Sequence, residues 1–143
     1  MLLPSCTVGI QIHFTGQAHW VTSAYIGGHV CLYDSYVSAV LTKSLKTQLK
    51  LVYQGKADKN GSLIVNEMPV QQQEKSYDCG LFAIAFAFHL AQGDEPSALN
   101  FDCQKMRQHL VACFENEVMS SFPMKVKGSS VCAKQIRNIN INY

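Results

Sequence analysis

Alternation of apolar and polar residues, which is typical of strands that bury one face, recurs in the first half of the chain. It is clearest over residues 8–14, and strand-like stretches follow at 21–26 and 29–34. Only Gly27 and Gly28 separate the last two stretches, and this dipeptide suits a two-residue hairpin turn with positive φ. A further strand begins at Leu63. The pattern predicts a hairpin with residues 8–14 paired beside it, in a small, mostly antiparallel sheet.

Three segments carry the apolar spacing of helices. The first, residues 37–52, has lysines away from one apolar face, which is made by Val37, Val40, Leu41, Leu45, Leu49 and Val52. The second, residues 79–91, is apolar on every side and therefore belongs inside a core; Gly93 to Pro96 break the chain after it. The third runs from about 102 to 119, before Phe122-Pro123, and the residues expected to pack inward are Met106, Leu110, Cys113 and Phe114. These elements predict an α+β domain with helix 79–91 packed on the sheet.

The composition is that of one compact domain. The chain has 143 residues, of which 48% are hydrophobic and 15% charged, enough for a single core. A net charge of +2 is too small to indicate binding to nucleic acid or to an anionic membrane. No apolar run approaches the ~18 residues of a membrane span, and the first residues do not resemble a signal peptide.

We expect residues 1–123 to form the domain and residues 124–143 to form a basic tail. The tail contains Asn-Ile repeats and no acidic residue, and its basic residues are Lys125, Lys127, Lys134 and Arg137. This composition predicts a poorly ordered extension or the start of a further region. A basic docking arm is the less favoured alternative.

Cys79 lies where a short polar loop meets the apolar helix. In the first turn of a helix, unpaired backbone N–H groups and the helix dipole favour a negative charge. A thiol there is biased toward thiolate, the form that attacks a carbonyl carbon. The alternative is an inert buried residue, which is what most lone buried cysteines are. A nearby base with its own orienting group would favour the interpretation of Cys79 as a nucleophile.

The hairpin supplies such a pair. If Ile26 opposes His29 across the turn, His19 and Asp34 share one face of the ribbon as diagonal neighbours, ~7–8 Å apart by backbone. A one-residue slip would put them on opposite faces. A carboxylate beside a histidine fixes its tautomer and stabilises the imidazolium formed when it takes the thiol proton. Alternatively, Asp34 or Ser35 would cap the helix that follows.

A glutamine completes the set of candidate groups. Gln71, Gln72 and Gln73 precede Cys79 across a polar turn. A side-chain amide from this loop can donate a hydrogen bond to a developing oxyanion, alongside backbone N–H groups at the start of the helix. Gln73 is the choice on spacing. A solvated loop amide is the alternative.

These motifs occur in the order His19-Trp20, Tyr33-Asp34-Ser35, Gln73 and Asp78-Cys79-Gly80. In this order they resemble the Ulp/SENP-type cysteine proteases, over about residues 8–122, in a version similar to those of transposon-like and uncharacterised animal proteins. The adenoviral protease is a more distant relative. The resemblance implies a papain-like α+β fold and cleavage after the C-terminal Gly-Gly of SUMO or another ubiquitin-like protein.

The resemblance also implies a role for each residue. Cys79 would be the nucleophile, His19 the base, Asp34 its orienting group and Gln73 an oxyanion donor. Trp20 would line the channel for the Gly-Gly tail, although a core tryptophan is the alternative. No cofactor is implied. The partner would be SUMO or a related protein and its conjugates, with neither nucleic acid nor membrane.

The chain departs from the family pattern at its start. Only 18 residues precede His19, where the family has helices and a tunnel-lining segment. Two other functions therefore stay open. One is a truncated, non-catalytic module that binds a ubiquitin-like protein. The other is a protease of viral or mobile-element type with a different protein substrate.

Six cysteines stand at long, irregular spacings without a CxxC pair, so they indicate neither a disulfide framework nor a zinc ribbon. Free thiols fit an intracellular, nuclear or cytoplasmic setting. His109 and Cys113 are one helical turn apart, but no second pair accompanies them, so we expect no metal site.

Overall fold

The computed structural model describes residues 8–37, 41–125 and 136–143. The elements in these ranges are, in chain order, β1 (Val8–Phe14), β2 (Trp20–Ile26), β3 (His29–Tyr33), α1 (Lys43–Val52), β4 (Ser62–Glu67), α2 (Cys79–Ala91), a short 3₁₀ helix (Pro96–Ala98), α3 (Cys103–Glu115) and β5 (Arg137–Asn142).

The strands form one mixed sheet in the order β1-β2-β3-β4-β5. β2 and β3 are the predicted hairpin: Ile26 pairs with His29, and the turn residues Gly27 and Gly28 have φ of 58° and 88°. The register on which the His19–Asp34 inference depended is therefore confirmed. β1 pairs antiparallel with β2 and β5 with β4, whereas β3 and β4 run parallel, so the sheet is mostly antiparallel, as expected.

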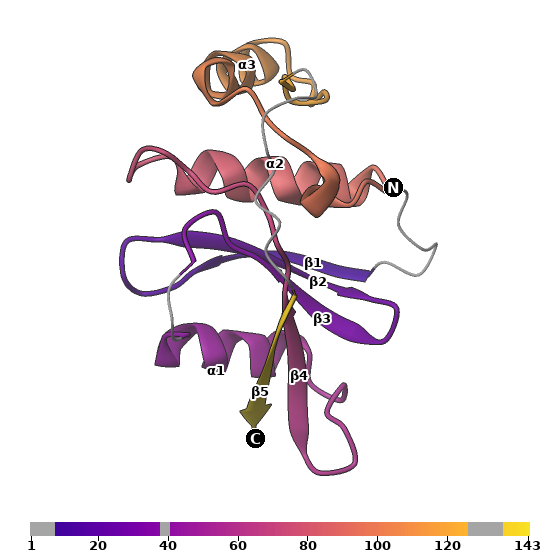
Figure 1. The fold of residues 1–143 in the computed structure, drawn as a ribbon. Coiled ribbons are helices and arrows are strands. Elements are labelled where there is room, and N and C mark those ends of the chain that lie inside the picture. Colours follow the sequence, from indigo (N-terminus) through magenta and orange to yellow (C-terminus); the bar gives the residue numbers. More distant parts are fainter. Residues whose placement is uncertain (1–7, 38–40, 126–135) are drawn as a thin grey trace.

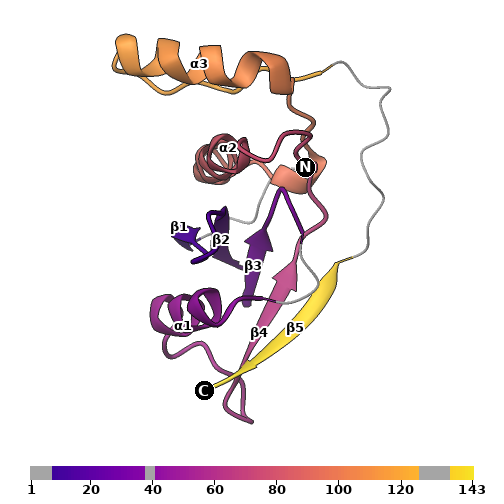
Figure 2. The same cartoon turned by 90° about the vertical axis from the view of Figure 1, so that its left-hand side faces the viewer.

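The helices lie in layers on the two faces of the sheet (Figures 1 and 2). α2 covers one face, α3 lies on the outer side of α2, and α1 covers the opposite face. Because α2 is apolar on all sides, it can contact sheet and α3 at once, and its Phe82 and Phe86 are fully buried. On the other face, Leu45 and Leu49 of α1 pack into a second core. The α+β fold is the one that the sequence predicted.

No helix in the described ranges is both long and apolar enough to cross a membrane.

α1 is shorter than the helix predicted over residues 37–52. It begins at Lys43, and its N-cap is Thr42, whose hydroxyl accepts a hydrogen bond from the Leu45 N–H at 3.1 Å. The alternative in which Asp34 or Ser35 caps this helix is therefore wrong, which leaves the Asp34 carboxylate available to His19.

Two residues expected to pack inward are exposed instead. Val52, at the end of α1, is 43% exposed, and Phe114 of α3 is 67% exposed. α3 contacts the core through one stripe, made by Met106, Leu110 and Cys113, and the next residue after Cys113 necessarily points away from it. α3 also ends at Glu115 rather than near residue 119. Val40 lies outside the described residues.

The prediction of a poorly ordered C-terminal tail is wrong for residues 137–142. They form β5, which pairs with β4 from Ser62↔Asn142 to Glu67↔Arg137. The Asn-Ile alternation is that of a strand with one buried face, and Ile141 is buried. Lys127 and Lys134 lie outside the described residues, and the domain boundary after residue 123 stays a prediction.

Candidate active site

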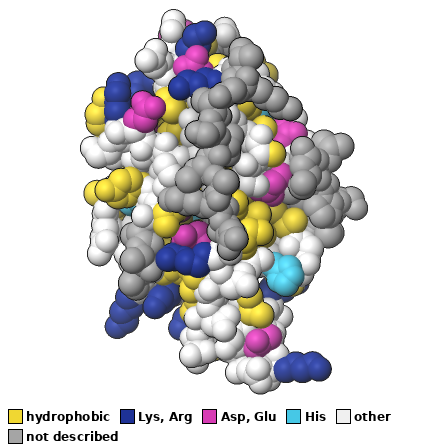
Figure 3. Space-filling view, viewed as in Figure 1, with side chains coloured by type: hydrophobic (Ala, Val, Ile, Leu, Met, Phe, Trp, Pro, Cys, Tyr) yellow, Lys and Arg dark blue, Asp and Glu magenta, His cyan; other side chains and the backbone are white. Residues whose placement is uncertain are grey.

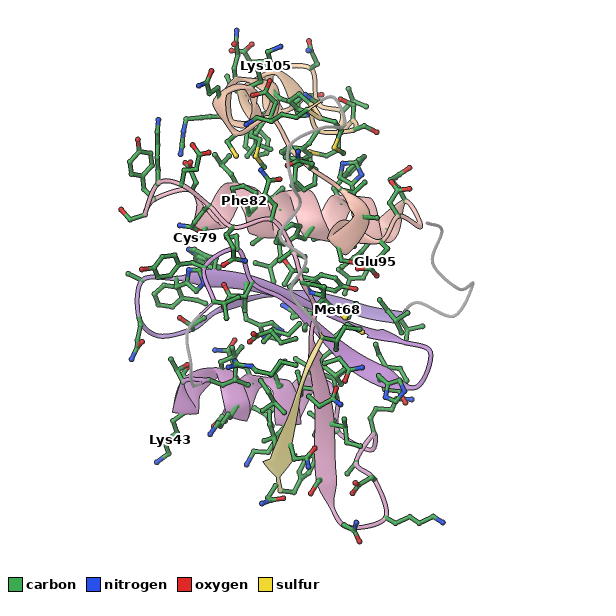
Figure 4. All side chains as sticks on the ribbon, viewed as in Figure 1. Lys43, Met68, Cys79, Phe82, Glu95 and Lys105 are labelled. Carbon is green, nitrogen blue, oxygen red and sulfur yellow. The ribbon has the colours of Figure 1, made fainter. Side chains whose placement is uncertain are left out.

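Cys79 is the first residue of α2, as the sequence pattern predicted, and it is buried. Figure 4 shows it at one end of the helix, between the helix and the sheet. The first N–H groups of a helix have no partner within the helix and form the positive end of its dipole. Cys79 therefore stands where a thiolate and a developing oxyanion are both favoured.

His19 and Asp34 meet at the open end of the β2–β3 hairpin. His19 Nε2 lies 2.6 Å from Asp34 Oδ1, the distance of a strong, charge-assisted hydrogen bond. The same carboxylate oxygen accepts the backbone N–H of Tyr36 at 2.9 Å, which holds the carboxylate in place. The predicted proximity of His19 and Asp34 is confirmed.

The pKa of His19 is raised above its usual value, chiefly because the imidazole donates a hydrogen bond to the Asp34 carboxylate. Burial of the ring opposes this effect. The charge of Asp34, and then a hydrogen bond and charge from the Cys79 sulfur, raise the pKa further. Because Nε2 is bonded to Asp34, Nδ1 is the nitrogen left to exchange a proton with the thiol.

The side-chain amides of Gln71 and Gln72 use both of their N–H groups in hydrogen bonds within the protein. The Gln71 amide nitrogen donates to the Phe101 carbonyl at 3.0 Å and to the Cys103 sulfur at 3.3 Å. The Gln72 amide nitrogen donates to two backbone carbonyls, at 3.0 and 3.1 Å. Since a side-chain amide has two N–H donors, neither residue has a donor left for a substrate.

Gln73 is the exception among the three glutamines. Its amide nitrogen donates to the Lys75 carbonyl at 2.8 Å, and its Oε1 accepts the Ser35 hydroxyl at 2.6 Å. Within the described residues, its second amide N–H has no partner. The structure thus agrees with the choice of Gln73 on spacing, while its role as oxyanion donor stays a prediction.

Trp20 is not a core residue, because it is 43% exposed. Its Cδ1 would lie 3.9 Å from a β-carbon at Gly80, so the indole lies beside the residue that follows Cys79. Phe14 packs against the indole, with ring centroids 5.1 Å apart. Sequence reasoning missed Phe14, since in an alternating strand it looks like any outward-facing aromatic residue.

Arg107 of α3 is a second residue that sequence reasoning missed. Its guanidinium lies 3.2 Å from the carboxylate of Asp78, the buried residue that precedes Cys79, and it also lies 5.8 Å from the centre of the Tyr77 ring. The ion pair fixes the loop from which α2 starts. No sequence signal pairs an arginine with an aspartate 29 residues earlier.

A small cavity of about 140 Å³ lies beside the His19–Asp34 pair. Its other walls are formed by residues before β2, after β3 and around the N-terminus of α1, namely Thr15, Gln17, Tyr36, Leu41, Thr42 and Leu45. The cavity therefore joins the candidate site to the N-terminal end of α1.

Cys113 of α3 lies beside a histidine. Cys113 Sγ lies 3.4 Å from His109 Nε2, which also lies 3.0 Å from the Ser120 carbonyl. Across the described ranges, no three His, Cys, Asp or Glu side chains are grouped so that they could hold a metal ion. Cys31, Cys79, Cys103 and Cys113 are free thiols, while Cys6 and Cys132 lie outside the described residues.

The comparisons with known proteins agree with this geometry. Residues 7–119 match the family model described as the Ulp1 protease family, C-terminal catalytic domain. No curated protein matches the sequence.

Two solved structures share the fold. One is the SUMO protease Ulp1 with its catalytic cysteine oxidised to a sulfenic acid, and the other is the C-terminal Ulp1 protease domain in complex with Smt3, the yeast ortholog of SUMO. Each matches with a TM-score of 0.55 and 13% identity, over 76% of this chain and 52% of the solved chain. The chain thus spans about half the length of these solved chains.

Proposed function

The chain belongs to the Ulp1 protease family, and on this premise we propose that it is a thiol protease that cleaves after the C-terminal Gly-Gly of SUMO or another ubiquitin-like protein. The observation that carries the proposal is the 2.6 Å His19–Asp34 hydrogen bond beside Cys79 at the start of α2. A thiol, an imidazole and a polar group that orients the imidazole form the catalytic unit of papain-like proteases, and here the orienting group would be the Asp34 carboxylate.

The first half of the reaction forms a thioester. His19 takes the Cys79 proton, and the thiolate attacks the carbonyl carbon of the terminal glycine. The tetrahedral intermediate then collapses: the carbon–nitrogen bond breaks, and His19 returns the proton to the leaving amine. The Asp34 carboxylate holds the ring and stabilises the imidazolium, which agrees with the raised pKa of His19.

The second half hydrolyses the thioester. His19 takes a proton from water, the hydroxide attacks the thioester carbon, and the carbon–sulfur bond breaks. The products are the free carboxylate of the ubiquitin-like protein and the regenerated thiol. In both halves, the free N–H of Gln73 and the Cys79 backbone N–H stabilise the oxyanion. The side chains of this site suffice for these steps.

The exposed indole beside Gly80 supports a narrow channel for a glycine tail. Trp20 would form one wall of the channel. The fold match to a complex of Ulp1 with Smt3 supports SUMO as the first protein to test. Such a substrate also places the protein in an intracellular, nuclear or cytoplasmic setting, which is part of this proposal.

Covalent capture tests the proposal. The purified chain and its Cys79→Ala variant are each incubated with SUMO and with ubiquitin that carry a C-terminal thiol-reactive group, and the intact mass is measured. We expect an adduct of one partner with the wild-type chain and none with the variant.

The competing functions predict other results. A non-catalytic module binds the partner with equal affinity in both variants and forms no adduct. A protease with another substrate forms no adduct with either partner but cleaves a peptide library at a site other than Gly-Gly. Circular dichroism of both variants shows whether they are folded.

A further inference from the structure

A groove runs along the outer side of α1, on the face of the sheet opposite to α2. Its volume is about 510 Å³, and its walls include three residues of α1, namely Thr47, Lys50 and Leu51, together with Gln54, Gly61 and Tyr143. Lys50 and Leu51 lie three and four positions after Thr47, so the three residues share one face of the helix. Leu51 is 68% exposed and Tyr143 is 54% exposed, and both present apolar surface to solvent.

Lys50 lines this groove, and four more lysines belong to the segments around it, although the ammonium of Lys56 lies over the Tyr25 ring, 4.8 Å from its centre. Lys43 and Lys46 lie about two turns and one turn before Lys50 on α1, while Lys56 and Lys59 lie in the connection to β4 that forms the other wall. Asp58 is the one acidic residue between Lys43 and Gly61. Its Oδ1 accepts the backbone N–H groups of Asn60 and Ser62, at 2.9 and 3.0 Å.

The charge of these lysines is not neutralised by the protein. Among the residues that the structure describes, no ion pair includes Lys43, Lys46, Lys50, Lys56 or Lys59. On α3, by contrast, Lys105 and Arg107 each face a carboxylate. Basic side chains gather over α1 in Figure 3, and Lys43 points away from the sheet in Figure 4.

We propose that this groove is a docking site for an acidic peptide segment that carries a large apolar side chain. The unneutralised lysines attract and orient an acidic segment, because complementary charge steers association. The volume between Leu51 and Tyr143 accommodates an apolar side chain, which fixes the position of the segment. The mainly apolar lining of the groove suits a peptide side chain better than a nucleic-acid backbone, whose phosphates require a continuous basic track.

The groove is linked to the candidate active site by α1 itself. Leu41 and Thr42, at the N-terminal end of the helix, line the cavity that holds His19 and Asp34. α1 has ten residues and is therefore about 15 Å long, a distance that an extended segment of about five residues spans. One protein can thus reach both places. That it is the protease substrate rests on the proposed function, whereas the docking itself does not.

Fluorescence anisotropy tests the docking directly, without catalysis. The probe is a labelled twelve-residue peptide with a central Leu-Phe pair flanked by glutamates, and the matched peptide has glutamines in place of the glutamates. We expect saturable binding of the glutamate peptide at low salt, at least tenfold weaker binding of the glutamine peptide, and a loss of affinity as salt rises.

Two variants locate the site. Lys46→Glu/Lys50→Glu should weaken binding at least tenfold, and Leu51→Ser should weaken it about fivefold at every salt concentration. Lys105→Glu/Lys125→Glu, which changes the net charge equally on the other side of the molecule, should bind as the wild type does. Circular dichroism establishes that all variants are folded.

Three results would overturn the docking site. The first is no saturable binding by the folded wild-type chain. The second is equal weakening by the two charge-reversed double variants, which would mean that only net charge matters. The third is tighter binding of single-stranded RNA or of anionic vesicles through the same lysines. Because each readout is binding, failure of the proposed protease activity would leave all of them unchanged.

Discussion

Two histidines, one on β1 and one directly before β2, have surroundings that give them opposite properties. His13 of β1 pairs with Val21, two residues beyond His19 along the chain. His13 is 2% exposed, and its ring nitrogens lie 2.6 Å from the Ser23 hydroxyl and 3.2 Å from the Gln48 amide oxygen. His19 is partly exposed and bonds to Asp34.

The pKa of His13 is lowered from 6.5, because burial disfavours the imidazolium and the hydrogen bond to Gln48 only partly compensates. The pKa of His19 is raised, because a carboxylate outweighs the burial of a ring that stays partly open to solvent. The comparison teaches that the proton-binding properties of a histidine depend on its hydrogen-bond partner and on the burial of its ring. The residue type and the position in the sheet do not decide them.

The position of α1 explains why the two imidazole rings differ in burial. Gln48 lies in the middle of α1, above His13, whereas His19 lies where the hairpin strands end and α1 starts. His13 therefore belongs to the packing between sheet and helix, and its hydroxyl neighbour Ser23 also lies 2.6 Å from the Tyr53 hydroxyl.

The largest effect expected from this comparison is on activity. His19→Gln should lower kcat/KM for a SUMO-tail substrate by ~10⁵-fold, the order lost when the base of a catalytic unit is removed. His13→Gln should leave kcat/KM per folded molecule within about threefold of wild type. Steady-state kinetics on both variants, corrected for the folded fraction, checks this. Equal losses in the two variants would contradict the distinction between them.

Removing the carboxylate should make His19 resemble His13. Asp34→Asn keeps the shape of the side chain but removes its charge, so the pKa of His19 should fall. We expect kcat/KM to drop by ~10³–10⁴-fold. The pH–rate profile measures the change, because its limb assigned to His19 should move to lower pH. A profile that drops in height without moving would mean that Asp34 only holds the ring in position.

For stability, the larger effect is expected from the His13 variant and the smaller one from the His19 variant. His13→Gln should lower the free energy of unfolding by about 2 kcal/mol, since it leaves buried polar groups without partners. His19→Gln should lower it by less than about 1 kcal/mol, because its ring is at the rim of the fold. Urea unfolding followed by circular dichroism gives both values. Greater destabilisation by His19→Gln than by His13→Gln would show that the rim pair stabilises the fold.

The smallest effect is the pH dependence of that stability, and its sign differs between the two rings. For His13, whose folded pKa is depressed, the stabilisation is present above 6.5 and is lost as pH falls toward the folded pKa. For His19, whose folded pKa is raised, the stabilisation is present below 6.5 and is lost as pH rises through the folded pKa. Unfolding measured at pH 5.5 and 7.5 for wild type, His13→Gln and His19→Gln isolates each contribution.

If His13 instead stabilises the wild type on acidification, the imidazolium is donating into the Ser23–Tyr53 chain. The contrast between the two rings would then fail. A His19→Gln variant with the same pH dependence as the wild type would likewise contradict the raised pKa of His19.

Much of the site could be predicted because its parts are local. The Gly27-Gly28 turn fixes a register, and the register brings His19 beside Asp34. An apolar run that starts at Cys79 identifies a buried helix and places the thiol in its first turn. These inferences need only the apolar periodicity and one turn geometry, and both depend on residues that are close together in the sequence.

Other features depend on contacts between distant segments. Three of them join residues far apart in the chain. Arg107 pairs with Asp78, Gln71 and Gln72 donate to backbone carbonyls, and Gln48 of α1 contacts the buried ring of His13. The predicted tail was wrong because β5 is stable only where β4 offers it an edge. The prediction that Phe114 packs inward was wrong because its neighbour Cys113 already faces the core.

By itself, then, the sequence determined most of the elements, the hairpin register, the family and the candidate nucleophile, base and orienting carboxylate. Only the tertiary structure decided which glutamine keeps a free donor, which histidine is buried among neutral partners, and which lysines are left without a counter-charge. The physical reason is the range of the interactions. Turn geometry and periodicity act over a few residues, whereas burial, hydrogen-bond partners and local charge are set by segments that meet only in the folded chain.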